Sequence, residues 1–203
     1  MTIRIESYAT DQGRKSLDAL RDRFALADSK CARTVTDILE QVRSRGDEAV
    51  VEYTRRFDAP DMTQEELRVS EEEFAQAAEA VDEEFMATLS FAAERIRLFH
   101  EREREESWML TRDDGTIIGR LVRPVDSAGL YVPGGQGGST PLVSSVLMNA
   151  IPAGIAGVQQ RVMMTPPNKE GRVAPALLMA AKEVGITEVY KAGSAWASIS
   201  AAI

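Results

Sequence analysis

Histidine and cysteine are nearly absent from this sequence. Its 203 residues include one histidine, His100, and one cysteine, Cys31. A catalytic zinc ion usually has three protein ligands, mostly imidazole and thiolate groups, and an activated nucleophile needs a base beside it. These two residues stand far apart in the chain and supply neither set without several carboxylates. We therefore predict that the chain holds no complete catalytic or metal site.

Long apolar runs, a signal-peptide pattern and clustered basic residues are missing as well. No apolar stretch reaches membrane-spanning length, and one cysteine excludes an internal disulfide framework. The net charge of −8 divides into −10 over residues 1–106 and +2 over residues 107–203. A nucleic-acid surface would need clustered Lys and Arg instead. We predict a cytoplasmic protein that binds neither nucleic acid nor membrane.

Apolar residues recur at helical spacing through the first half of the chain. We predict helices at residues 16–24, 34–44, 47–57, 70–81 and 82–105. Gly46 is expected to end the second helix, and Ser70 with Glu73 forms the capping-box pattern that opens the fourth. In the last helix, Leu89 and Phe99 are expected to share one apolar face. The first half is therefore predicted to be mainly helical.

The periodicity changes near residue 107. Residues 108–111 and 117–122 predict a hairpin around Asp113-Asp114-Gly115. Further on, strands at 128–132, 160–164 and 188–191 alternate with helices at 143–156 and 173–184. This βαβαβ order predicts a parallel sheet. The predicted fold class is α/β and incomplete, with a helical N-terminal segment and hairpin over residues 1–127, part of a first α/β domain, and a Rossmann-like half-domain over residues 128–203.

A glycine-rich loop follows the first strand of the predicted parallel sheet. Gly134, Gly135, Gly137 and Gly138 occupy four of five consecutive positions. Strand, glycine loop and helix in this order let backbone amides approach a phosphate or ribose closely. An ordinary strand-to-helix turn is the alternative. The G-x-G-x-x-G fingerprint is absent, so the spacing alone does not name NAD.

Parallel sheets of this kind bind ligands at the carboxyl ends of their strands. Three segments fall at those ends, namely residues 131–135, 165–167 and 192–194. This placement predicts a cofactor cleft at that edge of the sheet.

Several longer segments carry a specific resemblance. They are GLYVPGG at 129–135, SSVLMNAIPA at 144–153, AGV at 156–158, TPP at 165–167, RSRGDEAVVEYTRRFDAP at 43–60, RIRLFHERE at 95–103 and ESW at 106–108. Together they resemble histidinol dehydrogenase, from about the thirties to about residue 193. The loop QGGSTPLV at 136–143 is a few residues longer than the commonest family version.

The resemblance implies a zinc-dependent homodimeric oxidoreductase that oxidises L-histidinol to L-histidine with two NAD, the last reaction of histidine biosynthesis. In that family the zinc ligands and the Glu-His acid–base pair lie beyond the part of the chain corresponding to Ile203. We therefore expect this chain to be inactive alone, with no catalytic or metal residues. We also expect a truncated or frame-altered reading frame, or a cut at this point.

The resemblance also assigns the cofactor-binding residues within the half-domain at 128–203. Tyr131 corresponds to the tyrosine at the NAD site, and Pro133, Gly134 and Gly135 line the same strand end. The alternative for Tyr131 is an aromatic side chain packed in the core. Trp196 stands where the family has a glutamine that contacts NAD, and an indole donates a hydrogen bond but cannot accept one.

Other interpretations stay open. The chain could be a non-catalytic interaction or nucleotide-binding remnant, a gene product without a role, or a relative acting on another small amino alcohol or polyol. His100 either contacts substrate or metal, or is a solvated or hydrogen-bonded residue near a helix end. Cys31 precedes a predicted helix, where a thiolate would be stabilised, or it is a bystander thiol. The role of Asn149 is open.

Overall fold

A computed structural model describes residues 5–22, 29–134 and 141–193. The chain divides into two compact units, Met1–Glu40 and Gln41–Ile203, and each is described by itself. The domain boundary predicted between residues 127 and 128 is distinct from the division into these two units, and it stays a prediction. Within the described ranges, no helix is long and apolar enough to cross a membrane.

The first unit contains α1 (Asp11–Asp22) and the beginning of α2 (Ser29–Arg45). Helix α1 begins five residues before the predicted start, at the hydroxyl of Thr10, which accepts a hydrogen bond from the Gly13 N–H at 3.1 Å. The first turn of α1 is polar, so the apolar periodicity on which the prediction rested could not indicate it. Cys31 lies inside α2, so the prediction that it precedes a helix was wrong.

After the last residues of α2, the second unit contains three helices whose ends are set by local chemistry. They are α3 (Asp47–Phe57), α4 (Glu71–Glu79) and α5 (Glu83–Glu101). Gly46 separates α2 from α3 with a φ of 61°, as predicted, because glycine adopts positive φ without steric cost. The capping box of Ser70 and Glu73 is confirmed. Helix α5 ends at Glu101, and Phe99 is 64% exposed, so the predicted apolar face does not extend that far.

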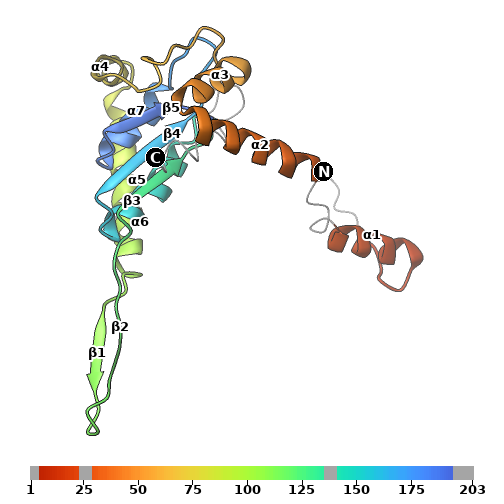
Figure 1. Cartoon of the computed structure of the whole chain (residues 1–203), viewed down its shortest axis with the longest axis vertical. Coiled ribbons are helices and arrows are strands. Elements are labelled where there is room, and N and C mark those ends of the chain that lie inside the picture. Colours follow the sequence, from red (N-terminus) through yellow and green to blue (C-terminus); the bar gives the residue numbers. More distant parts are fainter. Residues whose placement is uncertain (1–4, 23–28, 135–140, 194–203) are drawn as a thin grey trace. The chain divides into compact units, whose positions relative to one another are not determined.

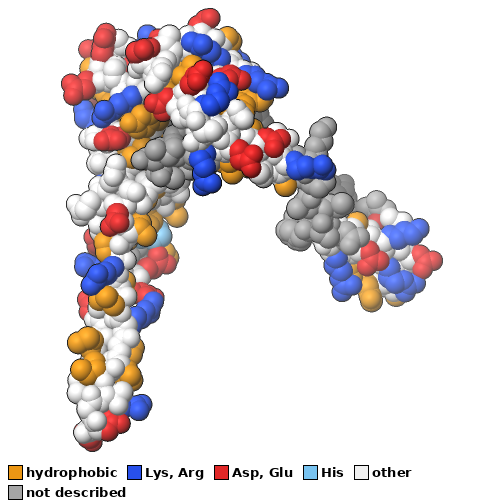
Figure 2. Space-filling view, in the orientation of Figure 1, with side chains coloured by type: hydrophobic (Ala, Val, Ile, Leu, Met, Phe, Trp, Pro, Cys, Tyr) orange, Lys and Arg blue, Asp and Glu red, His pale blue; other side chains and the backbone are white. Residues whose placement is uncertain are grey.

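The predicted hairpin is confirmed as β1 (Trp108–Thr111) paired antiparallel with β2 (Ile117–Arg120). In its turn, the Asp114 carboxylate accepts a hydrogen bond from the Thr116 N–H at 2.9 Å, which lowers the pKa of Asp114. Every residue of both strands is exposed. Figure 2 shows the resulting line of apolar side chains along this hairpin.

The predicted parallel sheet is confirmed, with strand order β3-β4-β5. Its strands are β3 (Ser127–Tyr131), β4 (Gln160–Thr165) and β5 (Glu188–Lys191), and its connections are α6 (Val143–Ile155) and α7 (Pro175–Glu183). The fold class is therefore α/β, a βαβαβ half-domain preceded by helices. Gly185 follows α7 with a φ of 75°, at the predicted helix end.

The main core lies on one face of this sheet. Leu130, Met163 and Val189 are register partners across the three strands, and all are buried. They pack in one cluster with apolar residues of α4, α5, α6 and α7, and Figure 1 shows α5 and α6 behind the sheet. Burying each such side chain contributes roughly 1.5–3 kcal/mol. Because successive side chains of a strand point to opposite faces of the sheet, the next row lies on the opposite face; it consists of Tyr131, Met164 and Tyr190.

Candidate functional site

The carboxyl ends of the three parallel strands lie together, as the sequence predicts. We call this region the carboxyl edge, and it comprises residues 131–134, 165–167 and 191–193. The pairing of β3 with β4 continues one residue beyond β3, because the Val132 N–H donates to the Met164 carbonyl at 2.8 Å. Thr165 and Lys191 are register partners at the ends of β4 and β5. One continuous edge therefore carries most of the segments predicted to meet a cofactor.

Gly134 brings the loop after β3 against the loop after β4. A Cβ atom at position 134 would lie 2.7 Å from the Pro166 ring carbon Cγ, closer than any side chain allows. The two loops therefore touch through backbone and proline ring, and no side chain at position 134 separates them. Pro133, beside it, is exposed. The contact with Pro166 therefore requires glycine at position 134.

Tyr131 closes the first strand with its side chain on the face opposite the main core. It is 36% exposed, so the alternative of a fully packed core aromatic does not hold. Because the Val132 N–H faces β4, the Tyr131 carbonyl faces the open side of β3. There it accepts a hydrogen bond from the side-chain amide Nδ2 of Asn149 in α6, at 3.1 Å. Asn149 thus holds the end of the strand that carries Tyr131.

Thr165 is the most deeply buried polar residue of the carboxyl edge. Its relative exposure is 0%, and its hydroxyl has no hydrogen-bond partner within the described part of the chain. A buried hydroxyl without a partner costs about 1–3 kcal/mol. From the sequence, Thr165 was predicted only to lie in segment 165–167 at a strand end, with no role of its own.

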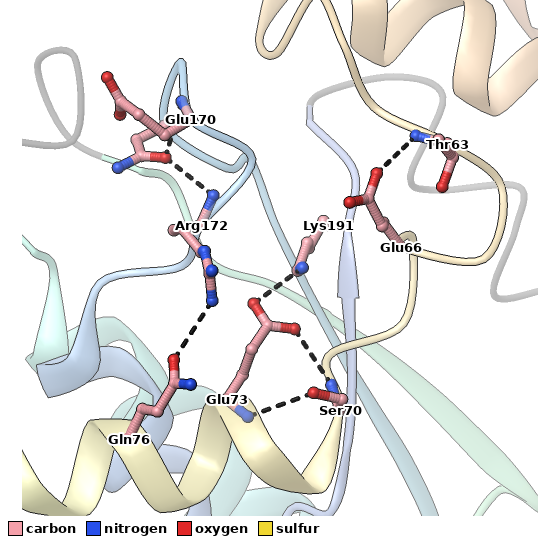
Figure 3. A network of polar contacts seen from close by, with 9 residues as sticks. Thr63, Glu66, Ser70, Glu73, Gln76, Glu170, Arg172 and Lys191 are labelled. Atoms are coloured by element: carbon pink, nitrogen blue, oxygen red, sulfur yellow. Dashed lines mark hydrogen bonds and ion pairs between the residues drawn. The ribbon is translucent and has the colours of Figure 1, made fainter.

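Lys191 is a functional candidate that sequence reasoning missed. Its ammonium is buried at the end of β5 and forms an ion pair with Glu73 Oε1 at 2.8 Å (Figure 3). Glu73 belongs to the capping box of α4, more than a hundred residues earlier in the chain. No local sequence pattern joins two such distant positions.

A polar cavity of about 300 Å³ lies beside this ion pair. Its lining includes Glu66, Glu73, Gln76, Glu170, Arg172 and Lys191. The Arg172 guanidinium donates to Gln76 Oε1 at 3.3 Å, and the Thr63 N–H donates to Glu66 Oε2 at 2.9 Å (Figure 3). The second bond lowers the pKa of the Glu66 carboxyl. Lys191 and Glu73 therefore pair with each other, whereas Arg172 and Glu66 bond to a neutral amide and to a backbone N–H.

Two predicted cofactor residues, Gly135 and Trp196, lie outside the described residues, and their assignment stays a prediction. His100 lies near the end of α5, where its Nδ1 is 2.5 Å from Glu103 Oε2 and its ring meets Phe99 edge-on at 5.2 Å. This is the hydrogen-bonded helix-end interpretation. Among the described residues, no three His, Cys, Asp or Glu side chains gather closely enough to hold a metal ion.

Comparison with known proteins gives one consistent family. The family model for histidinol dehydrogenase matches residues 21–203. The histidinol dehydrogenase of Desulfotalea psychrophila is 63% identical over 196 residues, which are 97% of this chain and 45% of that protein. That of Nitratidesulfovibrio vulgaris is 55% identical over 180 residues, 89% of this chain and 41% of that protein.

A solved structure agrees with the sequence relatives. The crystal structure of histidinol dehydrogenase from Elizabethkingia anophelis superposes with a TM-score of 0.74 at 34% identity. The match covers 84% of this chain and 38% of that chain. The 203-residue chain thus spans less than half the length of the relatives it matches.

Proposed function

The chain belongs to the histidinol dehydrogenase family. We propose that it is part of an NAD-dependent oxidoreductase that converts L-histidinol to L-histidine, with two NAD, in histidine biosynthesis. Within that enzyme the described chain contributes one wall of the NAD site, at the carboxyl edge. The hydride transfer itself is assigned to residues outside this chain.

The observation that carries the proposal is the pairing of an exposed aromatic ring with a bare backbone loop. Tyr131 offers a ring face and a hydroxyl at the end of β3, and Gly134, three residues on, carries no side chain and brings this loop against Pro166 of the loop after β4. Such a pair suits the ring and the phosphates of a nucleotide. We assign Tyr131, Pro133, Gly134, Gly135 and Trp196 to this site.

Zinc does not fit the part of the chain that the structure describes. No cluster of three suitable ligands occurs there, and the whole sequence has one histidine and one cysteine. We propose that the zinc ligands of the complete enzyme lie outside these 203 residues.

We further propose a cytoplasmic homodimer. The family membership supports the assembly, and so do the apolar side chains that β1 and β2 expose, Met109 at 79% and Ile117 at 63% among them. Exposed apolar patches of this kind mark surfaces that another protein surface covers. The single cysteine supports a reducing compartment.

A chimaera tests the catalytic proposal. Residues 1–193 are joined to the remaining portion of the Desulfotalea psychrophila enzyme, and NADH formation from L-histidinol is followed in the presence of zinc. We expect turnover, and we expect Tyr131→Ala to weaken NAD binding. A folded chimaera without activity, beside an active parent enzyme in the same assay, would refute the proposal.

A titration tests the NAD wall in the chain itself. We expect NAD to bind the 203-residue chain weakly, with a dissociation constant of about 1 mM or above, because an open edge leaves polar contacts in water. Tyr131→Ala should weaken binding further, while Trp196→Gln should strengthen it only slightly. Binding in the micromolar range that ignores Tyr131→Ala would place the nucleotide on another surface.

A further inference from the structure

The end of β5 is held by three separate contacts with one short segment, residues 67–73. On the free edge of β5, the Lys191 N–H donates to the Leu67 carbonyl at 2.7 Å, and the Val69 N–H donates to the Val189 carbonyl at 2.9 Å. Arg68 and Tyr190 form an antiparallel bridge between these two bonds. Segment 67–69 therefore closes the edge of β5 that β4 does not use.

The third contact is the ion pair of Lys191 with Glu73. The exposed fractions of the two side chains are 4% and 13%, so water screens the pair little. Glu73 Oε1 meets the lysine ammonium, while its other oxygen, Oε2, accepts from the Ser70 N–H at 3.2 Å (Figure 3). The Ser70 hydroxyl in turn accepts from the Glu73 N–H. One carboxylate therefore both caps α4 and pairs with β5.

We infer that Lys191 and Glu73 are positioning residues for the carboxyl edge, a role that rests on the NAD site proposed above. The ammonium is occupied by Glu73, so Lys191 acts on the backbone that follows it and not on a ligand directly. Ala192 and Gly193, which follow Lys191 at the carboxyl edge, are both buried. Pairing Lys191 with the first turn of α4 therefore fixes the backbone position from which these two residues start.

A buried ion pair fixes the relative position of its two partners more than it adds to the free energy of unfolding. Replacing such a pair with apolar or neutral groups of similar shape is often neutral or stabilising, whereas removing one partner strands a buried charge. Positioning and stability can therefore be separated. Lys191→Met keeps the length of the side chain, Glu73→Gln keeps its shape, and the double variant leaves no unpaired charge.

The experiment uses the 203-residue chain and its Lys191→Met, Glu73→Gln and double variants. Amide hydrogen exchange is measured at Val69 and Lys191, NAD affinity by titration, and the unfolding midpoint in urea. Arg172→Ala is the matched control, because it removes the neighbouring Arg172–Gln76 contact with α4 and leaves β5 untouched.

We expect the double variant to regain the wild-type unfolding midpoint, yet to exchange the backbone amides at positions 69 and 191 at least tenfold faster and to bind NAD at least threefold more weakly. Arg172→Ala should behave as wild type. Unchanged exchange in the double variant would overturn the positioning role. If Lys191→Met does not fold, Glu73→Gln and the double variant decide the question.

The two proposals fail differently. If the wild-type chain binds no NAD at any concentration, the nucleotide site is overturned, and so is the role of the Lys191–Glu73 pair in that site. The exchange data still report whether this pair holds the end of β5. NAD binding that is equal in wild type and double variant, together with faster exchange, keeps the nucleotide site and overturns the role of Lys191 in it.

Discussion

The backbone of Gly134 lies so close to the ring of Pro166 that the two loops at the ends of β3 and β4 leave no room for a methyl group between them. A Cβ at position 134 would lie 2.7 Å from Pro166 Cγ. Proline cannot withdraw as a flexible side chain would. The contact therefore fixes the spacing of two neighbouring strand ends at the carboxyl edge.

Gly134→Ala is expected to destabilise the chain by about 1–3 kcal/mol, the usual cost of overpacking a tight contact. Urea unfolding followed by circular dichroism measures the change. Gly154→Ala is the control, because its nearest atom is the terminal Nη1 of Arg161, at 2.8 Å, and a long side chain can shift by giving up its hydrogen bonds to Ala150 and Val184, whereas a proline ring cannot. Alanine also favours the α6 helix in which position 154 lies. Equal effects of the two substitutions would contradict the proposed rigidity of the Gly134–Pro166 contact.

Asn149→Asp is expected to cost about 1 kcal/mol, because a carboxylate cannot donate to the Tyr131 carbonyl and would face it with like charge. The measurement is the urea midpoint, with the exposed Ser144→Ala in the same helix as control. We also expect the exchange rate of backbone amides around Tyr131 to rise. A variant as stable as wild type, with unchanged exchange, would show that Asn149 does not hold the strand end.

Asp58, just after α3, should make stability depend on pH. Burial raises the pKa of its carboxyl, against a smaller opposing effect of Lys169, and one oxygen, Oδ2, is buried without a partner in the described structure. For a group whose pKa is raised on folding, the stabilising contribution is complete below the ordinary value of 3.8 and is lost as the pH rises through the folded pKa. Asp58→Asn should therefore raise the urea midpoint at pH 7.

The difference between Asp58→Asn and wild type should shrink as the pH falls and vanish below the ordinary pKa. The exposed Asp61→Asn controls for the removal of one negative charge. A gain in stability that is constant with pH would assign the effect to something other than the Asp58 carboxyl.

The 203-residue chain by itself is expected to produce no NADH from L-histidinol, with or without zinc. The reason is the missing set of imidazole and thiolate groups, since the sequence has one of each. Calorimetric titration should show zinc binding no tighter than to an ordinary acidic surface. One stoichiometric, tight zinc site, or steady NADH production above a buffer blank, would refute this expectation.

Much of the fold was predictable because its signals are local. Alternating strand and helix periods predicted the parallel sheet, and Ser70 with Glu73 predicted the start of α4 from a spacing of three residues. The end of α5 was not predictable in this way. The charged residues that follow Glu101 have a composition typical of a helix, so they do not mark its end. Phe99 has the spacing of a core residue, yet the fold leaves it exposed.

The sequence by itself determined the order of the elements, the glycine loop, the family resemblance and the scarcity of metal ligands, because each depends on residue type and short spacing. Only the tertiary structure decided which distant groups meet. Lys191 with Glu73, Asn149 with Tyr131, and Gly134 with Pro166 are joined by the crossing of strands and helices, a relationship that no local pattern encodes. The residue types at the carboxyl edge are therefore known from the sequence, whereas their arrangement depends on the tertiary contacts that each residue makes.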